Sequence, residues 1–143
     1  MMIDQILTSF VASAAFGIIF NAPRHSIIKS GFVGMFGWCI YSLLVADADT
    51  DSIVATLVAA FAIAIVSQVF AKLYKTPIII FNVAGIIPLV PGTLAYNSMR
   101  NIVENNYALA AQFGAKALMI SGAIAMGLVL SEIFNQMIRR VRL

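Results

Sequence analysis

The sequence predicts an all-α integral membrane protein with about five transmembrane helices, of which the fourth is interrupted by proline and glycine and is followed by an amphipathic helix. Of the 143 residues, 62% are hydrophobic and 10% are charged, and the mean hydropathy is +0.97. Soluble domains are about half apolar and about a quarter charged. The composition therefore excludes an ordinary soluble domain, and we expect residues 1–143 to form a single transmembrane domain in the lipid bilayer.

Five apolar stretches mark the expected spans, at residues 6–20, 31–46, 53–70, 77–90 and 117–134. A helix needs about 20 residues to cross the bilayer. The third and fifth stretches are long enough as they stand, the first and second need helical flanks, and the fourth is short. We expect the first stretch to be a retained helix rather than a cleaved signal peptide, because no basic residue precedes it.

The charges of the connecting segments predict the orientation of the chain. Segments 21–30 and 71–76 and the C-terminal tail carry basic residues, whereas segment 47–52 carries acidic residues and no base. Short loops rich in lysine and arginine stay in the cytoplasm. We therefore expect a multi-pass membrane protein with its N-terminus outside and its C-terminus in the cytoplasm. The residues expected on the cytoplasmic side are Arg24, His25, Lys29, Lys72, Lys75, Arg139, Arg140 and Arg142. Those expected on the outer side are Asp47, Asp49 and Asp51.

The interruption of the fourth stretch comes from Gly85, Pro88, Pro91 and Gly92. Proline removes a backbone donor and clashes with the preceding helical turn, and a freed carbonyl in hydrocarbon needs a protein partner or a wet cavity. An interrupted apolar segment is therefore the best indication of a transport path in this chain. The alternative is an ordinary turn that ends a helix near the outer interface.

Polar residues around the break are candidate contacts for a solute. Asn82, Thr93, Tyr96 and Asn97, together with unwound backbone, can hydrogen-bond a small polar or anionic solute. A helix that begins near Thr93 adds a positive dipole end for a carboxylate. In the alternative, Thr93 is a simple N-cap and Asn82 bonds a neighbouring helix.

Residues 94–107 predict an amphipathic helix after the break, because apolar residues recur near a helical period and polar residues fill the other faces. This helix is too polar to span in contact with lipid. It lies either on the outer surface or within the bundle, as the second arm of a hairpin. Arg100 either attracts a carboxylate solute or forms a surface pair with Glu104, four residues later.

Polar residues near the inner ends of two spans are expected to be structural. Ser67 and Gln68 are expected at the membrane interface, and Glu132 is expected to pair with Arg139 or another basic residue of the tail. A proton-coupling role for Glu132 is the alternative.

The sequence gives no support for catalysis or for a metal site. Cys39 and His25 are the single cysteine and the single histidine, so an intrachain disulfide and a histidine-rich metal site are excluded. The chain has no Ser/His/Asp set, no His-Glu-x-x-His and no phosphate loop. We therefore expect no enzyme activity and no cofactor, and the scattered basic residues predict no nucleic-acid partner.

Residues 78–93 read Ile-Ile-Ile-Phe-Asn-Val-Ala-Gly-Ile-Ile-Pro-Leu-Val-Pro-Gly-Thr. This run, followed by Tyr96 and the amphipathic helix, resembles the threonine/serine exporter family, in particular the small membrane subunit of its split, two-gene form. The resemblance implies secondary export of small metabolites, either amino acids such as threonine and serine or dicarboxylates such as succinate. It also implies a larger membrane partner, and it favours Pro88, Pro91, Gly92, Thr93 and Tyr96 as the functional region.

The residues and the resemblance together predict a subunit of a secondary exporter for small polar metabolites, which acts with a larger membrane subunit. Because no nucleotide-binding motif is present, ion or substrate gradients are expected to drive it. A homo-oligomer is the alternative assembly. A non-transporting membrane scaffold and a small channel are the alternative functions.

Overall fold

The computed structural model describes residues 2–46 and 50–141, and within this part every regular element is a helix. The elements are α1 (Met2–Ile19), α2 (Arg24–Ala46), α3 (Ser52–Tyr74), α4 (Ile78–Ile86), the 3-10 turn η1 (Ile87–Leu89), α5 (Gly92–Val103) and α6 (Tyr107–Val141). The predicted all-α class is confirmed. Asp47, Asp49 and Arg142, which contribute to the charge argument, lie outside the described residues.

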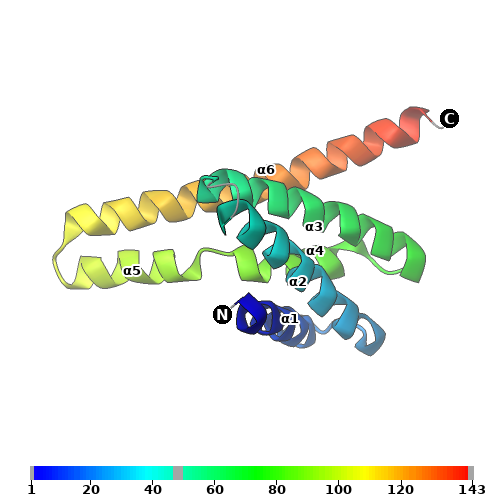
Figure 1. The fold of residues 1–143 in the computed structure, drawn as a ribbon, viewed down its shortest axis with the longest axis horizontal. Coiled ribbons are helices and arrows are strands. Elements are labelled where there is room, and N and C mark those ends of the chain that lie inside the picture. Colours follow the sequence, from blue (N-terminus) through cyan, green and yellow to red (C-terminus); the bar gives the residue numbers. More distant parts are fainter. Residues whose placement is uncertain (1, 47–49, 142–143) are drawn as a thin grey trace.

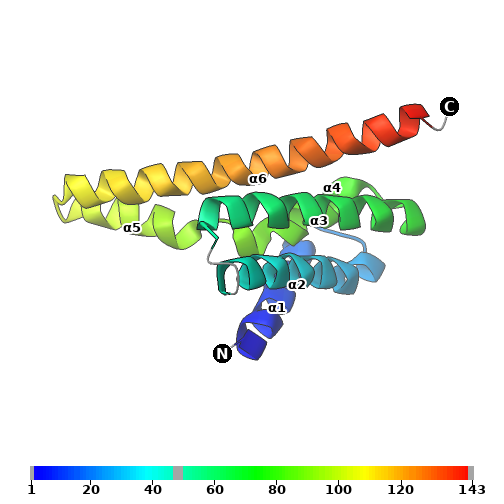
Figure 2. The ribbon, with the colours of Figure 1, turned by 45° about the horizontal axis from the view of Figure 1, so that its top comes forward.

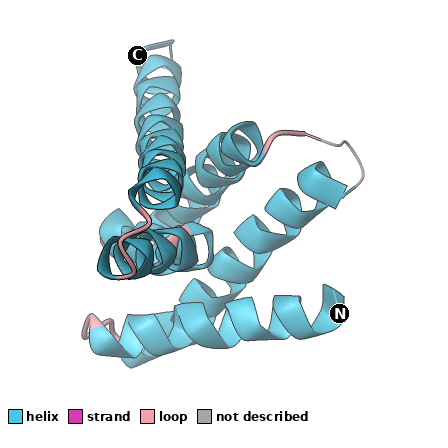
Figure 3. Ribbon diagram, turned by 90° about the vertical axis from the view of Figure 1, so that its left-hand side faces the viewer, coloured by secondary structure: helices cyan, strands magenta, loops and turns pink. Residues whose placement is uncertain are grey.

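Three helices of the described part, α2, α3 and α6, are long and apolar enough to cross a membrane. A fourth span results if α4 with η1 and α5 are counted together as one bent span. The remaining helix, α1, is shorter and lies across the others, as Figures 2 and 3 show. The structure thus supports a multi-pass membrane protein, and the count of five spans stays a prediction.

The helices pack through small residues. Figure 1 shows α2, α3 and α4 side by side, with the long α6 running along α3. Because lipid is as apolar as leucine, close backbone approach rather than burial drives such packing. A Cβ added at five glycines would meet an atom of another helix within 3.0 Å; these glycines are Gly31, Gly34, Gly37, Gly85 and Gly127. The helices also share a small apolar core that includes Val33, Ile63, Phe81 and Ile124.

Two helices run further than hydropathy predicted. Helix α2 begins at Arg24, so most of segment 21–30 is helical rather than a loop. Helix α3 likewise continues through most of segment 71–76 to Tyr74, and it ends where Lys75 adopts the left-handed conformation, with φ of 50°. Long basic side chains at a helix end can reach water, so the apolar stretch marks the part within the lipid and not the end of the helix.

The C-terminal end predicted for the helix over residues 94–107 is also wrong. Helix α5 stops at Val103, and α6 begins at Tyr107 after a turn in which Asn105 has φ of 59°. Asparagine tolerates this left-handed conformation better than most residues. In the same turn the Asn106 amide donates a 2.8 Å hydrogen bond to the Asn101 carbonyl. The chain therefore reverses direction, and α5 lies antiparallel to the first part of α6.

We call this hairpin, residues 92–118, the arm. Figures 1 and 2 show it extending beyond the end of α2 and the start of α3. Within the arm, the Ser98 hydroxyl donates a 2.8 Å hydrogen bond to the Ala110 carbonyl. Helix α5 contains no buried residue. The structure pairs α5 with α6 as a hairpin, but this hairpin extends beyond the other helices instead of lying among them, and its position relative to the membrane stays a prediction.

Candidate functional site

The break separates α4 from α5. Helix α4 ends at Ile86, continues as the single turn η1 that contains Pro88, and gives way to α5 at Gly92. The axes of the two halves differ by 54°. Pro91 occupies the cap position of α5, so Thr93 lies inside the first turn and is not the N-cap. The prolines account for the interruption, because neither can donate a backbone hydrogen bond.

A cavity of about 230 Å³ lies against this break, and we call it the break pocket. Its lining consists of residues 88–94 of the break, Trp38 and Tyr41 of α2, Thr56 of α3 and Ile120 of α6. Pockets for drug-sized ligands are typically about 300–1,000 Å³. The break pocket therefore suits a smaller solute.

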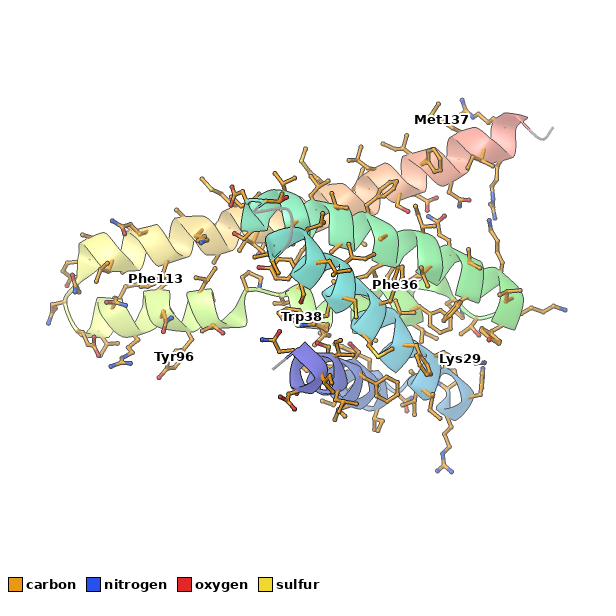
Figure 4. The ribbon with its side chains drawn as sticks, viewed as in Figure 1. Lys29, Phe36, Trp38, Tyr96, Phe113 and Met137 are labelled. Carbon is orange, nitrogen blue, oxygen red and sulfur yellow. The ribbon has the colours of Figure 1, made fainter. Side chains whose placement is uncertain are left out.

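Trp38 is the most informative side chain of this pocket. Figure 4 shows it on α2 at the level of the break. Its indole Nε1 is buried and has no hydrogen-bond partner among the described residues, and its ring lies 5.2 Å from that of Tyr41 between centroids. A buried donor without a protein partner is unusual in native proteins and calls for an explanation. A solute or solvent acceptor near the break would provide one.

A second cavity, of about 320 Å³, lies on the α1 side of the same break. It shares Trp38 and Pro88 with the break pocket, and α1 contributes Asp4, Gln5, Thr8 and Ser9 to it. The Thr8 and Ser9 hydroxyls donate to backbone carbonyls of their own helix, at 2.6 and 2.8 Å. Trp38 and Pro88 thus border two cavities, one on each side.

The structure brings four of the nine predicted site residues together. Pro88, Pro91, Gly92 and Thr93 line the break pocket. Gly85 lies earlier in α4, in a position where a Cβ would meet Val33 and Ile63 at 2.7 and 2.9 Å.

Asn82 also lies in α4, outside the pocket. Its side-chain Oδ1 is buried and has no hydrogen-bond partner among the described residues. The interhelical bond considered for it does not engage this oxygen.

The other three predicted residues, Tyr96, Asn97 and Arg100, lie on the arm outside the break pocket. Tyr96 is exposed and points away from α6 in Figure 4. The Arg100 Nε lies 2.8 Å from Glu104 Oε1, and both side chains are more than half exposed. The surface pair is thus the arrangement that the structure shows for Arg100.

The sequence interpretation did not include Trp38, Tyr41, Thr56 or Ile120 in the site. These residues come from three helices that are distant from the break along the chain, and periodicity does not reveal which helices meet. A lone tryptophan in an apolar span was the available signal. Among the described residues, no group of three or more histidine, cysteine, aspartate or glutamate side chains is placed to hold a metal ion.

Comparison with known proteins relates the chain to transporters. A family model described as "Threonine/Serine exporter, ThrE" matches residues 5–134. The chain is also similar to a threonine/serine exporter of Corynebacterium glutamicum, with 29% identity over 136 residues. That match covers 95% of this chain and 27% of the relative, so the chain spans about a quarter of the relative's length. No solved structure matches the chain.

Proposed function

The chain belongs to the threonine/serine exporter family, and we propose on this basis that it is a subunit of a secondary transporter that exports small polar metabolites across the bacterial inner membrane. The proposed substrates are amino acids such as threonine and serine, with dicarboxylates such as succinate as the second candidate. The structural observation that carries the proposal is the break pocket, a cavity lined by residues 88–94 of an interrupted helix pair. Transporters commonly bind solutes at such interrupted helices.

We propose that the path for the solute passes through the break pocket. Pro88, Pro91, Gly92 and Thr93 form its wall, where unwound backbone and a hydroxyl are available to a polar solute. Asn82 and Gly85 continue the path along α4. Tyr96, Asn97 and Arg100 form its outer approach on the arm.

A larger membrane partner is the second part of the proposal. It is supported by the length relation, since the chain spans about a quarter of an exporter of the same family. It is also supported by large apolar side chains that are exposed on all the long helices, such as Phe36, Val69 and Met126. Either lipid or the helices of a partner can cover these faces. A homo-oligomer is the alternative.

The proposed topology keeps five spans, with the N-terminus outside, the C-terminus in the cytoplasm and residues 1–143 as one transmembrane domain. Helix α6 has 35 residues, so it is about 52 Å long, whereas the hydrocarbon core is about 30 Å thick. Helix α6 therefore has to extend beyond the core. We assign the excess largely to the arm, which then stands on the outer side, beyond the end of α2 and the start of α3.

The rivals make different predictions. A non-transporting scaffold predicts that polar residues of the break can be replaced without loss of flux. A small channel predicts flux that does not saturate and shows no competition between solutes. A membrane enzyme has less support, since the described residues hold no cluster of metal-ligand side chains and the sequence carries no catalytic motif.

The test is efflux of labelled threonine, serine or succinate from loaded cells. This chain alone, a candidate larger subunit alone and the two together are compared at equal membrane levels. Saturable efflux from the pair, absent from either chain alone, is the expected result. No efflux of any of the three solutes from the pair would contradict the exporter proposal and favour a scaffold.

A further inference from the structure

A second polar site lies at the opposite end of α4 from the break. It is a pocket of about 280 Å³ lined by Gln68, Ala71 and Lys72 of α3, Ile78 of α4, and Glu132, Asn135 and Arg139 of α6. Ile78 precedes Pro88 by ten residues, which corresponds to about 15 Å along a helix. We call this cavity the inner pocket, because the proposed topology places it on the cytoplasmic side.

Helical spacing brings the polar residues of the inner pocket together. Gln68 and Lys72 are four residues apart on α3, so they share a face of that helix. Glu132, Asn135 and Arg139 are separated by three and four residues on α6, so they share a face as well. The two polar faces meet where α3 packs on α6.

Two contacts hold these faces against each other. The Gln68 amide, which is 9% exposed, donates to the Ser131 hydroxyl at 3.2 Å and to the Ser131 carbonyl at 3.3 Å. Next to it, Lys72 Nζ donates to Asn135 Oδ1 at 3.3 Å. Gln68 is therefore buried and bonded across the helices, and its expected depth at the membrane interface stays a prediction.

The charges of the inner pocket do not neutralise one another. The Glu132 carboxylate accepts a 3.2 Å hydrogen bond from the Gln136 amide. The expected pair of Glu132 with Arg139 is not formed, and neither Lys72 nor Arg139 makes an ion pair with any other described residue. Two cations and one carboxylate thus border one cavity without an ion pair among the described residues, and the partners that Lys72 and Glu132 do have, Asn135 and Gln136, are neutral.

We propose that the inner pocket binds the zwitterion of an amino acid before export. Lys72 and Arg139 receive its carboxylate, and Glu132 receives its ammonium group. The Asn135 amide nitrogen is the donor assigned to a side-chain hydroxyl such as that of threonine or serine, whereas the Gln68 amide stays bonded to Ser131. This inference rests on the proposed export function, and it adds a site and a choice among the proposed substrates.

The presence of both cations and a carboxylate in the inner pocket determines which of the proposed substrates it selects. A dicarboxylate such as succinate would bring a second anion toward Glu132, and like charges in one site repel. An amine without a carboxylate would meet Lys72 and Arg139 with the wrong sign. A zwitterion satisfies both signs, so the inner pocket selects amino acids against dicarboxylates.

The test measures binding of labelled L-threonine to the full chain in lipid nanodiscs, with unlabelled competitors. The competitors are threonine amide, which lacks the carboxylate, 3-hydroxybutyrate, which lacks the ammonium group, and succinate. We expect each to compete about tenfold or more weakly than threonine, since hydrogen bonds to charged groups are among the stronger ones.

The variants Glu132→Gln and Arg139→Gln identify the groups involved, and Arg140→Gln is the matched control, because Arg140 does not line the pocket. In Glu132→Gln, affinity for threonine is expected to fall about tenfold, while competition by 3-hydroxybutyrate does not weaken. In Arg139→Gln, the affinity for threonine is expected to fall by a similar factor, while competition by threonine amide does not weaken. Arg140→Gln is expected to bind threonine as the wild type does.

Two results would overturn the inner pocket as an amino-acid site. One is threonine binding that is absent, or that is equal in the wild type and in both pocket variants. The other is succinate competing as well as threonine does. Efflux measured in parallel distinguishes the failure of this site from the failure of the export proposal. If the wild type exports threonine and the pocket variants export it equally well, the export proposal stands and only the inner pocket is rejected as the binding site.

Discussion

Gly127 of α6 lies against the backbone of Leu57 on α3. A Cβ at position 127 would stand 2.7 Å from the Leu57 carbonyl oxygen and 2.9 Å from the Cβ of Ala60. Backbone atoms within a helix cannot move aside as the end of a flexible side chain can. This contact therefore helps set the separation of the two helices that contribute Thr56 and Ile120 to the break pocket and most of the polar residues to the inner pocket.

The first prediction is that Gly127→Ala lowers the free energy of unfolding by about 1–3 kcal/mol, the usual cost of overpacking. The measurement is SDS-induced unfolding in mixed micelles. Gly122→Ala is the matched control on the same helix, because a Cβ there would meet no atom within 4 Å. Equal unfolding of the two variants would contradict the close approach of α3 and α6.

The second prediction concerns Ser13 of α1 and Gly34 of α2. The Ser13 hydroxyl occupies the space that a Cβ at position 34 would need, and this hydroxyl has no hydrogen-bond partner among the described residues. Gly34→Ala is therefore expected to destabilise the protein by about 1–3 kcal/mol, and adding Ser13→Gly should recover at least half of the loss. Strict additivity of the two changes in a double-mutant cycle would show that the residues do not touch.

The third prediction tests the bond between Gln68 and Ser131. Ser131→Ala removes the hydroxyl that accepts at 3.2 Å, and interhelical hydrogen bonds in membranes average about 0.6 kcal/mol with a maximum of about 1.7. We expect a loss of stability within this range. Ser121 is an exposed serine on the same helix, so Ser121→Ala should unfold as the wild type does. A Ser131→Ala variant as stable as Ser121→Ala would mean that the bond contributes nothing.

The fourth prediction uses Trp38 as a reporter, since the chain contains a single tryptophan. Trp38 lines the break pocket, and its Nε1 has no partner among the described residues. Addition of threonine is expected to change its fluorescence in a saturable way, because a polar solute alters the surroundings of the indole. Thr93→Val, which removes a hydroxyl from the same pocket, should weaken this response. An emission spectrum unaffected by threonine would place the solute elsewhere.

The sequence was sufficient for the fold class and for the position of the longest spans. The apolar stretches at 53–70 and 117–134 lie inside α3 and α6, because a helix in lipid needs a continuous apolar run and little else produces one in this composition. The ends of these helices were less predictable. Helix α6 begins at Tyr107, well before its apolar run, since polar residues are compatible with helix once the chain leaves the lipid.

The candidate site was predictable only in the part that one segment contributes. Proline and glycine mark Pro88, Pro91 and Gly92 from the sequence, because their backbone chemistry is local. Trp38 and Thr56 reach the same pocket from α2 and α3, and the packing that brings them there depends on glycine contacts between helices. The inner pocket went unpredicted for the same reason, since Lys72 and Arg139 belong to different helices.

The central claim is that the solute path passes through the break pocket. It is tested most directly by the rate of threonine efflux from cells that carry both subunits, with Pro91→Ala and Thr93→Val introduced together in this chain. Both residues line the break pocket, so the initial rate is expected to fall at least about tenfold at normal membrane levels, because the variant loses the proline that interrupts the helix and a hydroxyl whose lost hydrogen bond costs about 1–3 kcal/mol. Pro23→Ala with Ser121→Ala is the control, since both residues are exposed and neither lines a pocket described here. Full efflux from cells whose two subunits include the Pro91→Ala, Thr93→Val variant of this chain would contradict the account. The break would then be structural, and the solute path would lie in the partner.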